Sequence, residues 1–331
     1  MAVKDILTEI EQDVTDVTKT NFIYNTTALV PSAADAGLTY ERGAEKKGKK
    51  LCSCVLYVDI RNSVALTEKH HSLTMGKIYT AFTKAVLKVA RYHSGHTRNI
   101  IGDRVMVVFP ESNCFTNAVD CAISINHISK YIITKQFPGV DFKCGIGIDY
   151  GELRIIKVGI QRNGNESGEN KGLVWAGYPA NIASRLTDNA NKKIEENYYE
   201  VVMNPINPRA IRPAYPSLIP FLGGQSTYDE KAPLYLSTTK TVEMSVEEFA
   251  GKVSQYSDGK LFMGGGNLIR FERKIRHNTF SPILLTEAVF EGFKKANLTR
   301  DDIIKGYWYE QKHQIKNVNC KVYGADVYWI I

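Results

Sequence analysis

An apolar strand that ends in a carboxylate is the feature that most constrains this fold. Residues 51–60, LCSCVLYVDI, are apolar except for Ser53 and Asp59. Successive side chains of a strand point to opposite faces of its sheet, so Tyr57 and Asp59 share one face. An unpaired ionised carboxylate is costly to bury. The sequence therefore predicts a buried strand with a cationic group beside Asp59.

A second carboxylate, Asp103, suggests why the first is placed in a buried strand. Asp103 lies at the tip of a predicted hairpin, IIGDRVMVVF, and beside the first strand its side chain can point at Asp59. Two such carboxylates raise each other's pKa unless a cation neutralises them. A hard ion such as Mg²⁺ takes one or two carboxylates together with phosphate oxygens, and a pair of ions can hold a phosphoryl group from both sides. Taken singly, each aspartate also fits an ordinary loop or turn role.

A third element is the predicted helix within GYPANIASRL, residues 177–186. Asn181 and Arg185 are four positions apart, so their side chains project from one face of the helix. A guanidinium can donate in a planar fork to a reacting phosphorus centre, and an amide can orient a sugar. The alternative is a solvated polar face.

These elements together resemble the class III nucleotidyl cyclases, the adenylate and guanylate cyclase family. The resemblance extends from about Leu51 to Asn204 and rests on four motifs: YVDIRNS, IIGDRVM, GIGIDYGEL and ANIASRL. It implies two divalent metal ions, Mn²⁺ or Mg²⁺, held by Asp59, Asp103 and the Ile60 carbonyl. One ion would activate the ribose 3′-hydroxyl for attack on the α-phosphorus, and the other would stabilise the pyrophosphate.

The resemblance also implies where the remaining groups come from. Backbone amides of Arg61, Asn62 and Ser63, at the start of a helix, would assist the leaving pyrophosphate. Asn181 and Arg185 would come from the opposite protomer, so two identical sites would form in a head-to-tail homodimer.

The expected base-reading positions depart from the purine cyclases. They hold Asn99 and Val174, neither of which matches the residues typical of adenylate or guanylate cyclases. Tyr57 would shorten the pocket and add a hydroxyl, which favours a smaller base, unless it is simply a core aromatic and the backbone contacts the base. In this the chain is similar to the pyrimidine (Pycsar) cyclases of bacterial antiphage defence, whose product activates a separate effector protein.

The predicted reaction is the conversion of UTP to 3′,5′-cyclic UMP and pyrophosphate. UTP is preferred over CTP because no acidic residue stands ready to accept from a cytosine amino group. The alternatives are a cytidylate cyclase, an adenylate cyclase and a catalytically inactive cyclase-like binding module.

The predicted fold is an α+β sandwich of the ferredoxin-like kind, because helices over about 63–93 and 113–135 alternate with antiparallel strands. The first of these helices is expected to break near His71. A second hairpin is expected to turn at Gly151.

Four segments are predicted along the chain. Residues 1–50 form an amphipathic helix, which packs on the body or on a partner chain, followed by a basic linker, and residues 51–204 form the catalytic domain. Six of the eleven prolines fall between Pro205 and Pro233, which marks 205–240 as a connector. Residues 241–331 would be a smaller C-terminal α+β module of unknown role.

The composition of the chain argues against several classes of protein. The formal charge of +7 comes from 42 basic and 35 acidic residues spread along the chain, which argues against a nucleic-acid-binding stripe. The six cysteines form no Cys-x-x-Cys pair and have no histidine at metal-ligand spacing, so they are expected to be reduced thiols. With neither a secretion signal nor an apolar run long enough for a membrane span, the expected location is the cytoplasm.

Overall fold

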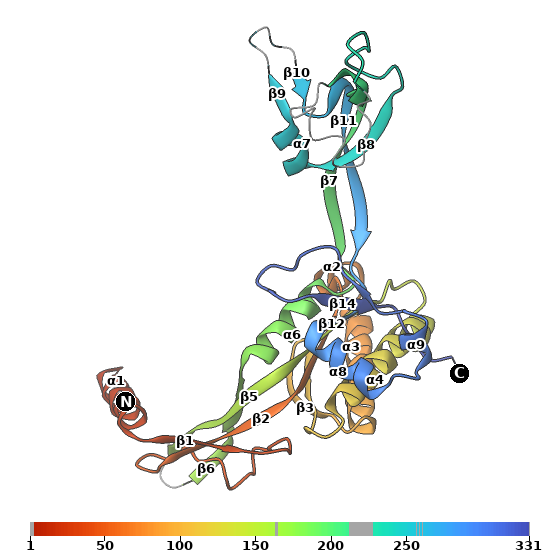
Figure 1. Cartoon of the computed structure of the whole chain (residues 1–331). Helices are drawn as coiled ribbons and strands as arrows, with labels where there is room; N and C mark the ends of the chain where they lie inside the picture. The colour runs from red at the N-terminus through yellow and green to blue at the C-terminus, as the bar shows by residue number, and fades with distance from the viewer. Residues whose placement is uncertain are drawn as a thin grey trace. The chain divides into compact units, whose positions relative to one another are not determined.

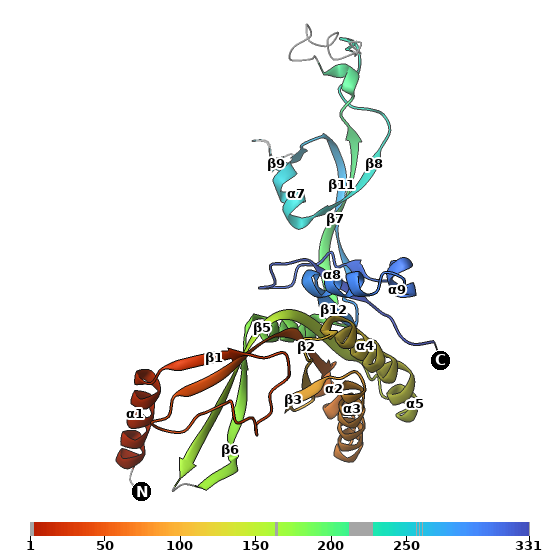
Figure 2. The same ribbon diagram turned by 60° about the horizontal axis from the view of Figure 1, so that its bottom comes forward.

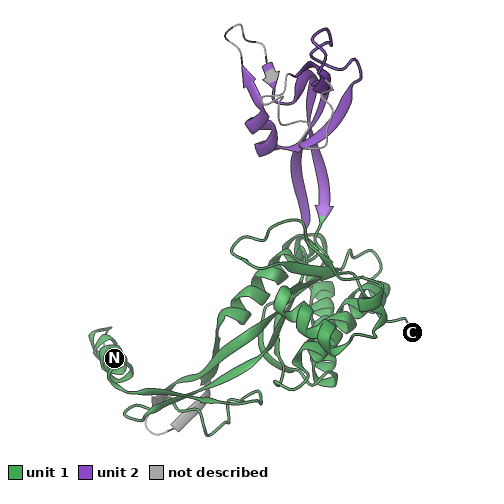
Figure 3. Cartoon of the chain, in the orientation of Figure 1, with its two compact units in different colours: residues 1–192, 279–331 green, residues 193–278 purple. Residues whose placement is uncertain are grey.

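The chain divides into two compact units. The computed structural model describes residues 3–162, 165–211, 228–255, 257, 259 and 261–330. Unit 1 comprises Met1–Lys192 with Thr279–Ile331, and unit 2 comprises Lys193–Asn278 (Figure 3).

The sheet of unit 1 is centred on the strand that carries Asp59, β2 (Lys46–Ile60). It lies between β5 (Cys144–Arg162) and β4 (Arg104–Val108), and both pairings are antiparallel. The hairpin predicted across Gly102 and Asp103 is confirmed, because β3 (His96–Ile101) pairs with β4. The remaining strands of this sheet are β12 (Ile283–Thr286), β14 (Val322–Ala325), β13 (Tyr309–Glu310), β1 (Phe22–Thr26) and β6 (Asn165–Ala176).

The hairpin predicted at Gly151 is wrong. β5 runs through this glycine without turning, because Gly151 pairs with Ser53 in the middle of the β2–β5 ladder. The chain reverses only after β5, and β6 returns antiparallel to it. Gly151 is therefore a position within a strand and not a turn.

Helices cover both faces of the sheet (Figures 1 and 2). One face packs against α3 (Ser72–Tyr92), α4 (Cys114–His127) and α8 (Glu287–Ala296), whose apolar side chains join those of the strands in one core cluster. The break expected near His71 is confirmed, because α2 (Ser63–Lys69) ends before it. Smaller helical elements follow α4 and α8: a π-helix over Ile128–Ile133, α5 (Thr134–Gln136) and α9 (Asp301–Ile304).

The other face of the sheet packs against α6 (Tyr178–Asn189). The backbone of this helix contacts β5 so closely that a Cβ added to Gly147 would lie 2.4 Å from the Ala183 oxygen. A Cβ at Gly145 would lie 2.5 Å from the Ala190 oxygen. The glycines of the GIGID motif therefore set the position of α6, the helix that carries Asn181 and Arg185.

Unit 2 is a five-stranded sheet in the order β8-β7-β11-β10-β9 with one helix, α7 (Val246–Lys252). Its core consists of Val201, Met203, Met244, Phe249 and Met263. Its elements are β7 (Lys193–Pro205), a short 3-10 helix (Pro208–Ala210), β8 (Lys240–Ser245), β9 (Val253–Gln255), β10 (Leu261–Met263) and β11 (Gly266–Thr279).

The α+β class is confirmed, but the division of the chain differs from the predicted one. Residues 279–331 belong to unit 1, because β12 pairs parallel with β5 and β14 pairs with β12. Unit 2 is thus an insertion into unit 1. Part of the predicted connector, residues 212–227, lies outside the described residues.

Two further expectations can be compared with the structure. Cys54, Cys114, Cys121 and Cys144 are buried free thiols, whereas Cys52 and Cys320 are exposed. Among the described residues, we find no helix with the length and apolar character that crossing a membrane requires.

Candidate active site

Asp59, at the end of β2, has the cationic neighbours that its burial requires. The Arg104 Nη2 donates to Asp59 Oδ2 at 2.8 Å, and Arg61 Nη2 lies 3.6 Å from the same oxygen. Both guanidinium groups are themselves largely shielded from solvent. The prediction of a cation beside Asp59 is confirmed, although in the single chain two arginines provide it.

Asp103 lies beside Asp59, in the turn between β3 and β4. Burial, and next the charge of Asp59, raise the pKa of the Asp103 carboxyl, while a hydrogen bond from Ser63 opposes this rise. Asp103 Oδ2 is buried and has no hydrogen-bond partner among the described residues. The two carboxylates are therefore brought together, and one of their oxygens is left unsatisfied.

This arrangement fits a divalent cation. Two carboxylates with an unpartnered oxygen are hard ligands of the kind that Mg²⁺ and Mn²⁺ prefer. The described residues contain no cluster of three or more His, Cys, Asp or Glu side chains that could enclose a metal. The other ligands would then be water, substrate oxygens and the carbonyl of Ile60, the last residue of β2. Mg²⁺ commonly binds in this way, with one or two carboxylates plus phosphate.

The segment after β2 agrees with the phosphate-binding prediction only in part. The amide of Arg61 donates to the Lys143 oxygen at 2.8 Å, so it is already used in the chain's own fold. Its guanidinium donates to the Thr187 and Asp188 oxygens at 2.7 and 3.1 Å. Asn62 precedes α2 in the left-handed conformation, with φ of 55°. The predicted amide donors are thus reduced to those of Asn62 and Ser63.

The residues expected to contact the base lie on neighbouring strands. Met106 of β4 is paired with Tyr57 of β2 on one side and with Asn99 of β3 on the other. The Asn99 Nδ2 is 3.9 Å from the Met106 sulfur, a weak contact. Burial raises the pKa of the Tyr57 hydroxyl, and the nearby charge of Arg104 opposes that effect. Tyr57 and Asn99 therefore share one face of the sheet, the face that packs against α6.

Asn181 and Arg185 lie on the exposed side of α6. The Arg185 Nη1 donates to the Asn317 oxygen at 2.8 Å. No hydrogen bond or salt bridge joins either side chain to Asp59 or Asp103 within the described part of one chain. A role for them at the carboxylate pair would therefore require a second copy of the chain.

Sequence reasoning missed how α6 contacts the carboxylate pair within the same chain. Arg104 is hydrogen-bonded to the Ser184 hydroxyl at 2.9 Å and forms a salt bridge with Asp188 as well as with Asp59. Ser184 and Asp188 are one helical turn apart, so one guanidinium can reach both. The sequence signal was the basic residue directly after Asp103 together with this i, i+4 pair.

Known proteins with similar sequences are nucleotide cyclases. A uridylate cyclase of Burkholderia cepacia is 32% identical over 172 residues, which cover 50% of this chain and 70% of that protein. A cytidylate cyclase of Staphylococcus aureus is 30% identical over 119 residues, 33% of this chain and 28% of that protein. The adenylyl cyclase CyaB of P. aeruginosa is structurally similar, with a TM-score of 0.44, 12% identity, and coverage of 83% of this chain and 94% of that one. No protein-family profile matches the chain.

The carboxylate pair on an antiparallel sheet and the similarity over most of a related enzyme define the class. The chain belongs to the class III nucleotidyl cyclase family. It is a nucleotidyl cyclase, a phosphorus-oxygen lyase. Three of its relatives are named for pyrimidine nucleotides, two as uridylate cyclases and one as a cytidylate cyclase.

Proposed function

We propose that the protein converts UTP to 3′,5′-cyclic UMP and pyrophosphate in a reaction that requires two divalent metal ions. The observation that carries the proposal is the pairing of Asp59 with Asp103, with Tyr57 two residues before Asp59 on the same strand face. Two relatives named uridylate cyclase, 32% and 24% identical to this chain, support the choice of UTP.

The chain's own residues then have distinct roles. Asp59, Asp103 and the Ile60 carbonyl would hold the two ions, which supply charge neutralisation for the phosphates and activation of the ribose 3′-hydroxyl. Asn62 and Ser63 would donate backbone amides to the triphosphate.

The transition state needs groups that one chain does not bring to the carboxylates. Arg185, from a second copy, would stabilise the negative charge that develops at the α-phosphorus, and Asn181 would orient the ribose. The exposure of both side chains supports this arrangement, since a head-to-tail homodimer would cover that side of α6.

Arg104 is well placed to compensate Asp59 before metal binds. Its salt bridge to Asp59 compensates the charge that a metal ion would otherwise compensate. Its salt bridge to Asp188 connects the same guanidinium to α6. With a metal bound at Asp59, Ser184 and Asp188 would still hold the Arg104 guanidinium in place.

The base is the least constrained part of the substrate. The bulk of Tyr57 would limit the room for a base, and its hydroxyl and the Asn99 amide can each donate or accept a hydrogen bond. CTP is therefore the alternative substrate, and the Staphylococcus aureus relative named cytidylate cyclase supports that alternative.

The biological role that fits these relatives is second-messenger synthesis in bacterial antiphage defence. In that role the cyclic nucleotide made in the cytoplasm activates a separate effector protein.

Product analysis tests the proposal directly. The protein would be incubated with Mn²⁺ and each of the four nucleoside triphosphates in turn, with Asp59→Asn as the matched inactive control. We expect cyclic UMP as the main product by mass spectrometry, and none from the control. Cyclic AMP or cyclic GMP as the main product would refute the pyrimidine assignment. Cyclic CMP would retain that assignment but show that the substrate is CTP and not UTP.

A further inference from the structure

Helix α1 (Val3–Lys19) carries an apolar face that its own chain leaves uncovered. Val3, Leu7, Ile10, Val14 and Val17 follow one another at intervals of four and three residues, so they form one narrow stripe. All five are exposed, from 49% for Ile10 to 74% for Val3, and α1 has no buried residue. We name these five side chains the α1 stripe.

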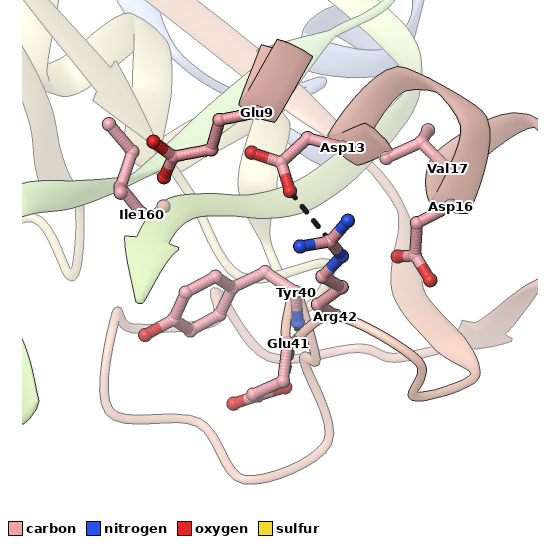
Figure 4. Close-up of a pocket in the computed structure, with 9 residues that line it drawn as sticks. Glu9, Asp13, Asp16, Val17, Tyr40, Glu41, Arg42 and Ile160 are labelled. Carbon is pink, nitrogen blue, oxygen red and sulfur yellow. Dashed lines mark hydrogen bonds and ion pairs between the residues drawn. The ribbon is translucent and has the colours of Figure 1, made fainter. Parts of the chain in front are cut away.

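The opposite side of α1 is the side that is tied to the body of unit 1. Asp16 forms a salt bridge with Lys46 at 2.9 Å and accepts from the Gly43 amide at 2.8 Å. Arg42 donates to Gln12 at 2.9 Å and lies 3.8 Å from Asp13, as the dashed line in Figure 4 shows. The polar contacts therefore hold the helix with Val3, Leu7, Ile10 and Val14 facing outward, while Val17 borders a pocket that Tyr40 and Ile160 also line (Figure 4).

A second uncovered surface lies on α3. Its outer side, opposite the core residues Ile78 and Phe82, forms a shallow groove with the nearby Phe137. We name this surface the α3 groove. Its lining residues are Ser72, Leu73, Gly76, Lys77, Thr80, Ala81, Lys84 and Phe137.

The two surfaces are complementary in charge as well as in polarity. α1 contains five acidic and two basic residues, whereas α3 contains four basic residues and no acidic one. Neither Lys77 nor Lys84 forms a salt bridge within the described part of the chain. Glu11 flanks the α1 stripe, where it would face such lysines. Pairing of α1 with another α1 would instead bring like charges together.

The groove cannot be filled by the helix of its own chain. α1 and α3 lie on opposite sides of unit 1 in both views (Figures 1 and 2), and α1 is fixed by Lys46 and Arg42. We propose that α1 of one copy docks through its stripe into the α3 groove of a second copy. This is the helix-in-groove mode of recognition, and it rests on the homodimer of the proposed function.

Disulfide trapping tests the geometry. In a background with the two exposed cysteines changed, Cys52→Ser and Cys320→Ser, an Ile10→Cys chain would be mixed with a longer, tagged Thr80→Cys chain under mild oxidation. We expect a cross-linked dimer of one short and one long chain. Thr8→Cys, exposed on the other side of α1, is the matched control and should give little of this product. Equal yields from both positions, or predominance of Ile10→Cys pairs alone, would overturn the proposal.

Charge exchange provides a second measurement that needs no cross-link. Glu11→Lys and Lys84→Glu should each raise the dimer dissociation constant several-fold in analytical ultracentrifugation. The double variant should bring the dissociation constant most of the way back to the wild-type value. Leu7→Glu should raise it by at least about tenfold, because it places a charge in the apolar contact. Additive losses in the double variant would contradict docking of α1 on α3.

The two proposals fail separately. Cyclic nucleotide formation without the α1–α3 cross-link would leave the cyclase assignment intact and refute only the docking. The cross-link without any cyclic nucleotide would refute the proposed reaction and leave the docking.

Discussion

At the scale of single residues, the site balances two carboxylates that repel each other. Asp59 is compensated by Arg104 and Arg61, whereas Asp103 has a raised pKa and an oxygen without a partner among the described residues. Repulsion between the two carboxylates destabilises the fold when no cation is bound. Because a bound cation relieves this repulsion, the same pair should bind a cation tightly.

Asp103→Asn should separate stability from function. The substitution removes the repulsion with Asp59, so we expect the melting temperature without metal to stay equal or rise. It also removes a carboxylate that we propose binds metal, so the rate of product formation should fall on the order of 10²-fold or more. Calorimetry with and without Mn²⁺ and a steady-state assay would measure both effects. A variant that keeps its activity would argue against a metal role for Asp103.

A buried acid outside the site predicts a dependence of stability on pH. Asp149 is 3% exposed, and burial raises the pKa of its carboxyl, an effect opposed by the hydroxyl of Thr286, which donates to Asp149 Oδ1 at 2.6 Å. A carboxyl with a raised pKa in the folded state contributes stability that is present below its ordinary pKa, near 3.8, and is lost as the pH rises through the raised value.

Asp149→Asn should therefore stabilise the protein by about 1 kcal/mol or more at pH 8, because the variant buries no charge. The gain should shrink as the pH is lowered toward 4. Urea unfolding of both proteins at several pH values would measure the difference. A gain that does not change with pH would show that burial of the charge is not its cause.

At the scale of elements, the position of α6 decides whether the site can form. The helix contacts β5 through Gly145 and Gly147, where added side-chain atoms would meet backbone at 2.5 and 2.4 Å. Because the same helix carries Ser184, Asp188, Asn181 and Arg185, a small shift of α6 would move groups on both of its sides.

Gly147→Ala should displace α6 and destabilise unit 1 by about 1–3 kcal/mol, with a larger loss of activity than stability alone explains. Gly151→Ala is the matched control in the same strand, because its added carbon would meet Pro179 at an ordinary 3.5 Å. Thermal unfolding and kcat would be measured for both. Equal effects of the two substitutions would contradict the close contact as the cause.

The sequence predicts these elements unevenly. The strand with Asp59, the Gly102-Asp103 hairpin and the break before α3 follow from local patterns of apolar residues and turn formers. Gly151 misled the prediction, since a glycine inside a strand has the same local sequence signal as a glycine required by a turn. Arg104 was missed for a similar reason: its partner Asp188 lies 84 positions away, and only tertiary structure brings them together.

At the scale of the whole molecule, unit 2 is inserted at a point where two chain segments of unit 1 are hydrogen-bonded to each other. Phe280 donates its amide to the Lys192 oxygen at 3.1 Å, and Asn191 donates to the Ser281 oxygen at 3.1 Å. The sequence did not predict this, because a parallel pairing such as that of β12 with β5 joins segments far apart along the chain and leaves no local pattern.

Unit 2 should therefore be removable. If an Asn-Gly dipeptide replaced residues 193–279, the bond from Phe280 to Lys192 would become the closing bond of a two-residue type I′ turn. Because the site residues all belong to unit 1, we expect a folded protein that still forms cyclic nucleotide. Circular dichroism and the product assay would check this, and loss of folding would show that unit 1 depends on the insertion.

The composite site predicts complementation between two inactive chains. An Asp103→Ala chain lacks a proposed metal ligand, and an Arg185→Ala chain lacks the guanidinium that would reach the partner's site. In a mixture of equal amounts, half of the dimers are mixed and each holds one intact site of two, so activity should recover to about one quarter of the wild-type level by symmetry. Each chain alone should remain inactive. Subunit exchange would be confirmed with differently tagged chains, because a mixture that exchanges and stays inactive would mean that Arg185 acts within its own chain.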